Sequence, residues 1–169
     1  MSNKQNAARK AAVLSLLSAL AIVFGWLENL LLPVLAFPPG VKPGLSNVAV
    51  MTAAALFGWP GGILIALVKS AFAGVTRGLT AFLMSGAGGL SSALVTGLLL
   101  RRDHKTLSPP GIGILGAVTH NAAQLGAACL LLGGTAVLWS APVLLLAAVL
   151  TGLLTGMLLK LVLSRRVGG

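Results

Sequence analysis

The sequence GIGILGAVTHNAAQLGAACLLL, residues Gly111–Leu132, is an apolar run long enough to cross a membrane as one helix. Three polar side chains interrupt it near its midpoint: His120, Asn121 and Gln124. At helical pitch His120 and Gln124 share one face, with Asn121 beside them. Polar groups in the middle of a bilayer are costly unless they are paired, hydrated or in contact with a ligand. The run therefore predicts a membrane helix that faces a binding cavity, with hydrogen bonding between helices as the other interpretation.

Composition assigns the chain to the membrane proteins. Of its 169 residues 57% are hydrophobic and only 8% are charged, and the mean hydropathy is +1.00. A soluble domain carries about 25% charged residues, so we expect one integral membrane domain over residues 1–169, embedded in the lipid bilayer. The net charge of +10 does not predict nucleic-acid binding, because the basic residues lie at the ends of apolar segments and not on a soluble surface.

The hydropathy pattern predicts an all-α membrane protein with six transmembrane helices, at about residues 11–32, 45–57, 60–77, 78–100, 111–132 and 141–163. A Pro- and Gly-rich loop at 36–44 separates the first two helices, because proline lacks the backbone donor that a helix needs. Small residues four positions apart, such as Gly89 and Ala93 or Gly152 and Gly156, predict closely packed helices. Nine of the twelve Lys and Arg residues lie on the side of the two termini. Because cytoplasmic loops are enriched in basic residues, we expect an N-in, C-in protein of the cytoplasmic (inner) membrane.

The remaining polar side chains gather in the outer half of the predicted bundle. We expect the following residues to line a ligand site: Trp26, Glu28, Lys42, Asn47, Lys69, Arg77, His120, Asn121 and Gln124. Lys69 lies near the middle of its helix and cannot easily extend its ammonium group to water. An ion pair with Glu28 is the alternative to ligand contact, whereas Trp26 is expected either to stack on a planar ligand or to anchor the helix at the interface.

The excess of positive charge in this region favours an anionic small molecule, such as a phosphate, a carboxylate or a nucleotide. Enzyme chemistry has little support, because the two acids, Glu28 and Asp103, are not paired for acid–base work. His120 and Cys129 do not have the spacing of metal ligands on one helix, and no phosphate-binding Gly-rich loop motif occurs. We therefore expect no catalytic residues, no metal and no required cofactor.

Two segments resemble a known family. Phe37–Asn47, FPPGVKPGLSN, followed by Gly111–Gln124, GIGILGAVTHNAAQ, is similar to the Gx transporter family, also labelled heptaprenyl diphosphate synthase component I. The resemblance extends over about residues 9–163. Pro43 and Ser46 stand where members more often have Leu and Ala, and Lys69 stands where Arg is common. These differences affect the rigidity of the loop and the geometry of the charges.

The resemblance implies a fold similar to the substrate-binding S components of energy-coupling-factor transporters. In those proteins small residues on the first helix contact a membrane partner, and Ala11, Ser15 and Ala19 have that spacing here. Relatives occur alongside membrane-anchored NusG-like domain proteins and flavin-transferase systems. This association implies a flavin, FMN or FAD, as bound cargo and a NusG-like domain protein as partner. The alternative is a non-catalytic accessory or scaffold subunit of isoprenoid or quinone metabolism that binds a prenyl diphosphate. Prenyl-diphosphate synthases use clustered aspartates, whereas this chain has only Asp103.

Overall fold

The computed structural model describes residues 3–31, 42, 44–101 and 107–167, and these residues form an all-helical bundle. The elements are α1 (Asn3–Leu31), α2 (Asn47–Phe57), α3 (Trp59–Arg77), α4 (Leu79–Arg101), α5 (Pro109–Leu132), the 3-10 helix η1 (Thr135–Ser140) and α6 (Ala141–Val167). Each predicted segment corresponds to one α-helix of the structure. The largest difference is at the N-terminal end, where α1 begins eight residues before the predicted start because no Pro or Gly interrupts the polar residues before Ala11.

Five helical segments in the described part of the chain are long and apolar enough to cross a membrane. The exception is α2, whose 11 residues rise only about 16 Å at 1.5 Å per residue, roughly half of a bilayer core of about 30 Å. The structure therefore confirms an all-α multi-pass membrane protein, but it does not confirm the count of six spans. The predicted end of the first span and most of the Pro- and Gly-rich loop, residues 32–41 and 43, lie outside the described residues.

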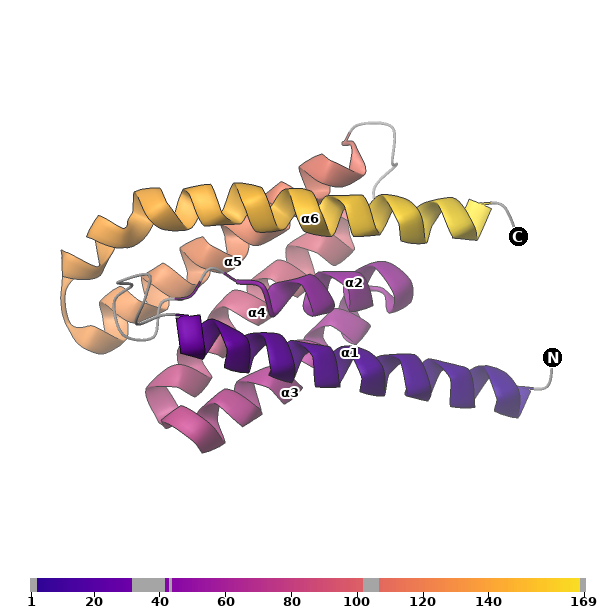
Figure 1. Ribbon diagram of the computed structural model, residues 1–169, viewed down its shortest axis with the longest axis horizontal. Coiled ribbons are helices and arrows are strands. Elements are labelled where there is room, and N and C mark those ends of the chain that lie inside the picture. Colours follow the sequence, from indigo (N-terminus) through magenta and orange to yellow (C-terminus); the bar gives the residue numbers. More distant parts are fainter. Residues whose placement is uncertain (1–2, 32–41, 43, 102–106, 168–169) are drawn as a thin grey trace.

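The helices form two layers (Figure 1). In that view α6, α2 and α1 lie nearer the viewer, and α5, α4 and α3 lie behind them. The first turn of α1 and the last turn of α6 lie at the same end of the bundle, as the predicted orientation requires. The side of the membrane on which they lie stays a prediction.

Small residues bring neighbouring helix backbones close together, as the four-residue spacing predicted. A Cβ atom added at Gly89 on α4 would lie 2.9 Å from the Cβ of Ala66 on α3. One added at Gly152 on α6 would lie 2.5 Å from the Cα of Ile114 on α5. Because real side chains do not approach this closely, these two pairs of helices pack at a distance that only glycine permits.

The short α2 leaves non-helical backbone inside the bundle. Lys42, Gly44 and Ser46 precede α2 and are all buried. Backbone that is buried away from water needs hydrogen-bond partners within the protein. The partners of this segment, residues 42 and 44–46, define the candidate site.

Candidate functional site

Glu28 on α1 holds the segment before α2 in place. Its Oε1 atom accepts hydrogen bonds from the backbone N–H of Gly44, at 2.6 Å, and of Leu45, at 2.5 Å. Gln124 on α5 accepts another from the backbone N–H of Lys42, at 3.2 Å. One carboxylate and one amide thus supply the acceptors that a helix would otherwise provide, and they connect α1, α5 and the segment.

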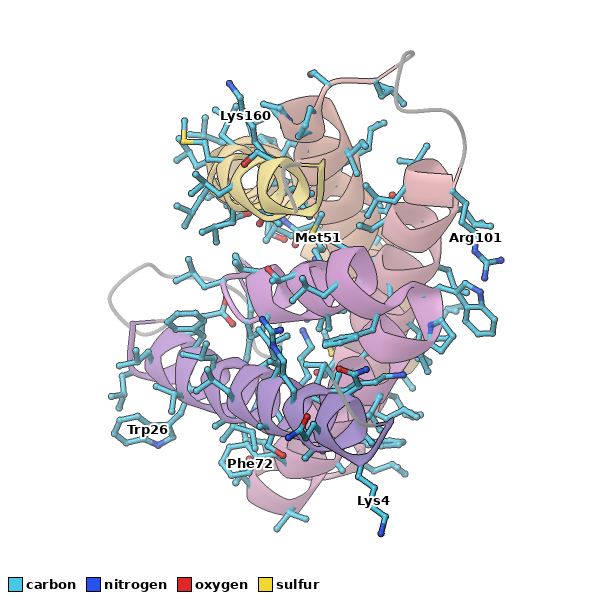
Figure 2. The ribbon with its side chains drawn as sticks, turned by 90° about the vertical axis from the view of Figure 1, so that its right-hand side faces the viewer. Lys4, Trp26, Met51, Phe72, Arg101 and Lys160 are labelled. Atoms are coloured by element: carbon cyan, nitrogen blue, oxygen red, sulfur yellow. The ribbon has the colours of Figure 1, made fainter. Side chains whose placement is uncertain are left out.

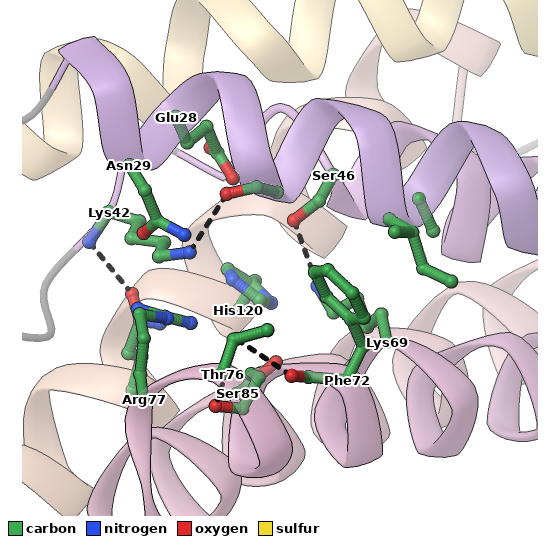
Figure 3. Close-up of a pocket in the computed structure, with 15 residues that line it drawn as sticks. Glu28, Asn29, Lys42, Ser46, Lys69, Phe72, Thr76, Arg77, Ser85 and His120 are labelled. Atoms are coloured by element: carbon green, nitrogen blue, oxygen red, sulfur yellow. Dashed lines mark hydrogen bonds between the residues drawn. The ribbon is translucent and has the colours of Figure 1, made fainter.

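A small polar cavity lies beneath this segment (Figure 3). Its walls come from α1, α3, α4, α5 and the segment itself. The lining residues are Ala21, Ile22, Gly25, Glu28, Asn29, Lys42, Ser46, Lys69, Phe72, Ala73, Thr76, Arg77, Ser85, His120 and Gln124. Lys69 and Arg77 are about two helical turns apart, so they extend from the same face of α3.

Three cationic side chains reach the cavity from two directions. Figure 3 shows Lys42 and Arg77 toward one end and Lys69 toward the other, with His120 between them in this view. The ammonium of Lys42 donates to the carbonyl of Gly25 at 3.2 Å, and the ammonium of Lys69 donates to the hydroxyl of Ser46 at 3.3 Å. Glu28 is the only acidic residue that lines the cavity among the residues that the structure describes.

The alternative of an ion pair between Glu28 and Lys69 is not what the described part of the chain contains. Among the described residues Glu28 directs one oxygen at two backbone N–H groups, and Lys69 bonds to a hydroxyl instead. The carboxylate nevertheless interacts electrostatically with Lys42, Lys69 and Arg77. It therefore acts on the whole group of cations and does not neutralise a single one.

Several buried polar atoms at the cavity wall have no hydrogen-bond partner. Within the described part of the chain they are Oε2 of Glu28, Oδ1 of Asn29 and Nε of Arg77. Each unpaired buried polar atom costs about 1–3 kcal/mol, so such atoms rarely gather in one place without a function. Donors and acceptors at one cavity are the arrangement expected of a site for a polar ligand.

Burial also changes the acid–base behaviour of the loop lysine. It lowers the pKa of Lys42 from 10.5 to about 8; the Arg77 charge adds to this shift, the Glu28 charge opposes it, and the Lys69 charge adds to it. Lys42 is therefore still cationic at neutral pH, but it loses its proton far more readily than a lysine in water.

The structure brings six of the nine predicted site residues to this cavity: Glu28, Lys42, Lys69, Arg77, His120 and Gln124. Asn47 and Asn121 are buried beside it but serve helix packing. Asn47 donates to the hydroxyl of Ser92 on α4 at 2.7 Å, and Asn121 donates to the carbonyl of Leu144 on α6 at 2.8 Å. For these two residues the alternative of hydrogen bonding between helices describes what the structure contains.

Trp26 does not reach the cavity. It is 54% exposed, and Figure 2 shows its ring pointing away from the bundle. Trp26 and Glu28 are two residues apart, which is about 200° around a helix, so they extend from opposite faces. Trp26 does not line this cavity, and its position suits the alternative, anchoring of the helix at the membrane interface.

Sequence reasoning missed several lining residues. The polar and aromatic ones are Asn29, Ser46, Phe72, Thr76 and Ser85. Phe72 and Thr76 follow Lys69 at helical spacings of three and seven, which place all three on one face of α3. That spacing is the signal that would have identified them. Phe72 provides the aromatic surface that Trp26 was expected to provide.

A tight contact fixes the imidazole of His120. A Cβ atom added at Gly88 on α4 would lie 2.7 Å from Cε1 of His120. A larger residue at position 88 would push the ring out of its place. The missing side chain of Gly88 thus makes room for the imidazole at the cavity wall.

A second, apolar groove lies on the other side of the segment before α2. It is formed by α1, the segment before α2, the start of α2 and α6, and it is lined by Phe24, Leu27, Leu30, Leu45, Val48, Leu154 and Leu158. Leu45 lines the groove, whereas the next residue, Ser46, lines the polar cavity. The segment is therefore the wall between a polar compartment and an apolar one.

Of the comparisons with known proteins, the one with family models gives a match. The model of the family described as heptaprenyl diphosphate synthase component I matches residues 17–162. The chain belongs to this family. The designation of the family as component I implies a further component. No curated protein and no solved structure matches the chain, so the expected similarity to S components stays a prediction.

Proposed function

We propose that this member of the family is a membrane subunit that binds an anionic organic molecule in the cavity between α1, α3, α4 and α5. The observation that carries the proposal is the convergence of Lys42, Lys69 and Arg77 on one buried space that contains a single carboxylate. A cluster of cations in a low-dielectric environment is stable only when anions compensate it. Glu28 compensates one charge, and the ligand supplies the rest.

The remaining features of the cavity favour the same class of ligand. Ser46 lies at the cavity wall and directly precedes α2, so the positive end of this helix dipole lies beside the bound anion. His120 and Gln124 add polar groups from α5. Recognition by fixed dipoles and cations needs no catalytic group, and we propose a non-enzymatic binding and transport role.

We propose a flavin, FMN or FAD, as the cargo, supplied to extracytosolic flavinylation. The support for a flavin is the family resemblance together with two features of the cavity. The cations suit a flavin phosphate, and Phe72 suits stacking on a planar ring. The row Ala11, Ser15 and Ala19 is exposed on α1 and is the proposed contact for a membrane partner, such as a NusG-like domain protein.

Binding of FMN to detergent-purified variants tests this proposal. We expect Lys69→Met to weaken FMN binding by about tenfold or more, since one tenfold step corresponds to ~1.4 kcal/mol and charge-assisted hydrogen bonds contribute ~1.5–3 kcal/mol. His120→Ala should weaken it as well. Lys160→Met is the matched control, because Lys160 is exposed on α6. Equal FMN affinity in Lys69→Met, His120→Ala and the control would refute the assignment of the site.

The apolar groove favours a second candidate function. A non-catalytic accessory subunit that binds a prenyl diphosphate would place the diphosphate near the cations and the hydrocarbon chain along the groove. Leu154 lines the groove from α6 and is 49% exposed, so Leu154→Trp fills groove space with little effect on the core. A loss of farnesyl diphosphate binding in Leu154→Trp, with FMN binding unchanged, would favour this function over the flavin. Unchanged binding of both farnesyl diphosphate and FMN in Leu154→Trp would show that neither ligand uses the groove.

A further inference from the structure

The ionisable groups of the cavity carry a defined charge. Lys42, Lys69 and Arg77 contribute three positive charges, and Glu28 contributes one negative charge, so the formal charge at neutral pH is +2. Glu28 cannot easily move away from this group, since its Oε1 atom is held by two backbone N–H groups. At neutral pH the fold therefore holds a formal charge of +2 at the site.

Unfilled hydrogen-bonding capacity accompanies this charge. An ammonium group carries three donors, and the hydrogen bond recorded for the ammonium of Lys69 goes to the hydroxyl of Ser46. Nε of Arg77 is buried without a partner among the described residues. Donors of Lys69 and Arg77 thus line a space in which Glu28 is the only acid that the described part of the chain contributes. This arrangement suits a head group with several acceptor oxygens.

We infer that the cavity selects a dianionic, phosphate-type head group over monoanionic and neutral groups of the same shape. The inference rests on the proposed function and narrows it to a class of ligand. A dianion brings the site to neutrality, whereas a carboxylate or a sulfate ester leaves one uncompensated charge in a low-dielectric environment. Neutral molecules leave both charges uncompensated and are excluded most strongly.

Phenyl phosphate and phenyl sulfate are suitable probes. They have nearly the same shape, but the phosphate ester is mostly a dianion at pH 7, with a second pKa of about 6, whereas the sulfate ester is a monoanion. Isothermal titration of the detergent-purified full chain at pH 7 compares the two. We expect the wild type to bind phenyl phosphate at least about tenfold more tightly than phenyl sulfate.

Variants that change the charge of the site test whether that charge causes the preference for phenyl phosphate. Lys69→Met lowers the formal charge by one and should reduce the preference to less than about threefold. Arg77→Met is the second variant, which keeps the test available if Lys69→Met does not fold, since Arg77 is only half-buried at the end of α3. Lys160→Met should keep the wild-type preference.

The outcomes separate this inference from the proposed function. Equal affinity of the wild type for both probes would overturn the dianion selection while leaving anion binding intact. A preference that persists unchanged in Lys69→Met and Arg77→Met would also overturn it, because the charge of the cavity would not be its source. Failure to bind either probe and FMN would overturn the proposed function itself.

Discussion

Replacement of Glu28 by alanine should release the segment before α2. Two backbone N–H groups, of Gly44 and Leu45, donate to the same carboxylate oxygen of Glu28 at 2.6 and 2.5 Å. A hydrogen bond to a charged acceptor contributes ~1.5–3 kcal/mol. With the lower figure for each bond, Glu28→Ala lowers the free energy of opening this segment by about 3 kcal/mol, a roughly 100-fold increase in the open population.

Hydrogen–deuterium exchange of the Gly44 and Leu45 amides measures this opening directly. Exchange should be roughly 100-fold faster in Glu28→Ala than in the wild type when local opening limits exchange. Glu28→Gln is the matched control, since its amide oxygen still accepts both bonds without a charge. Neutral hydrogen bonds contribute about 1 kcal/mol each, so Glu28→Gln should lie between the wild type and Glu28→Ala. Exchange rates within twofold of the wild type in Glu28→Ala would refute the role of Glu28 as the anchor of the segment.

Burial, reinforced by the charge on Arg77, lowers the pKa of Lys42 to about 8. Deprotonation of Lys42 should therefore weaken FMN binding, measured by fluorescence titration, as the pH rises from 7 to 9. In Lys42→Arg this decline in affinity should be smaller. Gly89→Val should lower the melting temperature by at least several degrees, since its Cβ would lie 2.9 Å from that of Ala66; a melting temperature equal to that of the wild type would contradict the close packing of α3 and α4. Trp26→Leu should leave FMN affinity within twofold of the wild type, because Trp26 is exposed outside the cavity; a tenfold loss would place it back at the site.

The sequence was sufficient to predict the helical architecture because the hydropathy of a segment can be judged from its own residues. Apolar runs bounded by Pro, Gly and charged residues identify membrane helices without knowledge of their neighbours. The same reasoning counted the short segment at about 45–57 among the six spans, although α2 is only 11 residues long. Length alone cannot tell whether the polar residues before a short helix lie in a surface loop or inside the bundle.

The candidate site was predicted in part, and different residues were missed or misplaced for different reasons. Lys69 and His120 were singled out because charged and polar groups are costly inside a membrane. Trp26 was included because it is near Glu28 in the sequence, but the helical pitch separates them. Phe72 carries no charge and has no such cost, so it was missed, and only its spacing from Lys69 could have identified it.

The partners of Glu28 could not be predicted from the sequence. Every residue except proline has a backbone N–H group, so the sequence does not mark those of Gly44 and Leu45 as partners. Only the fold brings them to the carboxylate of Glu28. The ion pair with Lys69 was the simplest alternative because both groups are charged. Hydrogen bonds to non-helical backbone replaced it, since that backbone would otherwise have unsatisfied donors.

Native mass spectrometry of the detergent-purified protein, with its absorbance and fluorescence spectrum, tests the central claim most directly. We predict that the wild type carries a near-stoichiometric anionic organic molecule with the mass and the spectrum of FMN or FAD. Lys69→Met should lose this bound molecule. A wild-type protein that carries no anionic organic molecule and does not bind added FMN, FAD or a prenyl diphosphate would contradict the account.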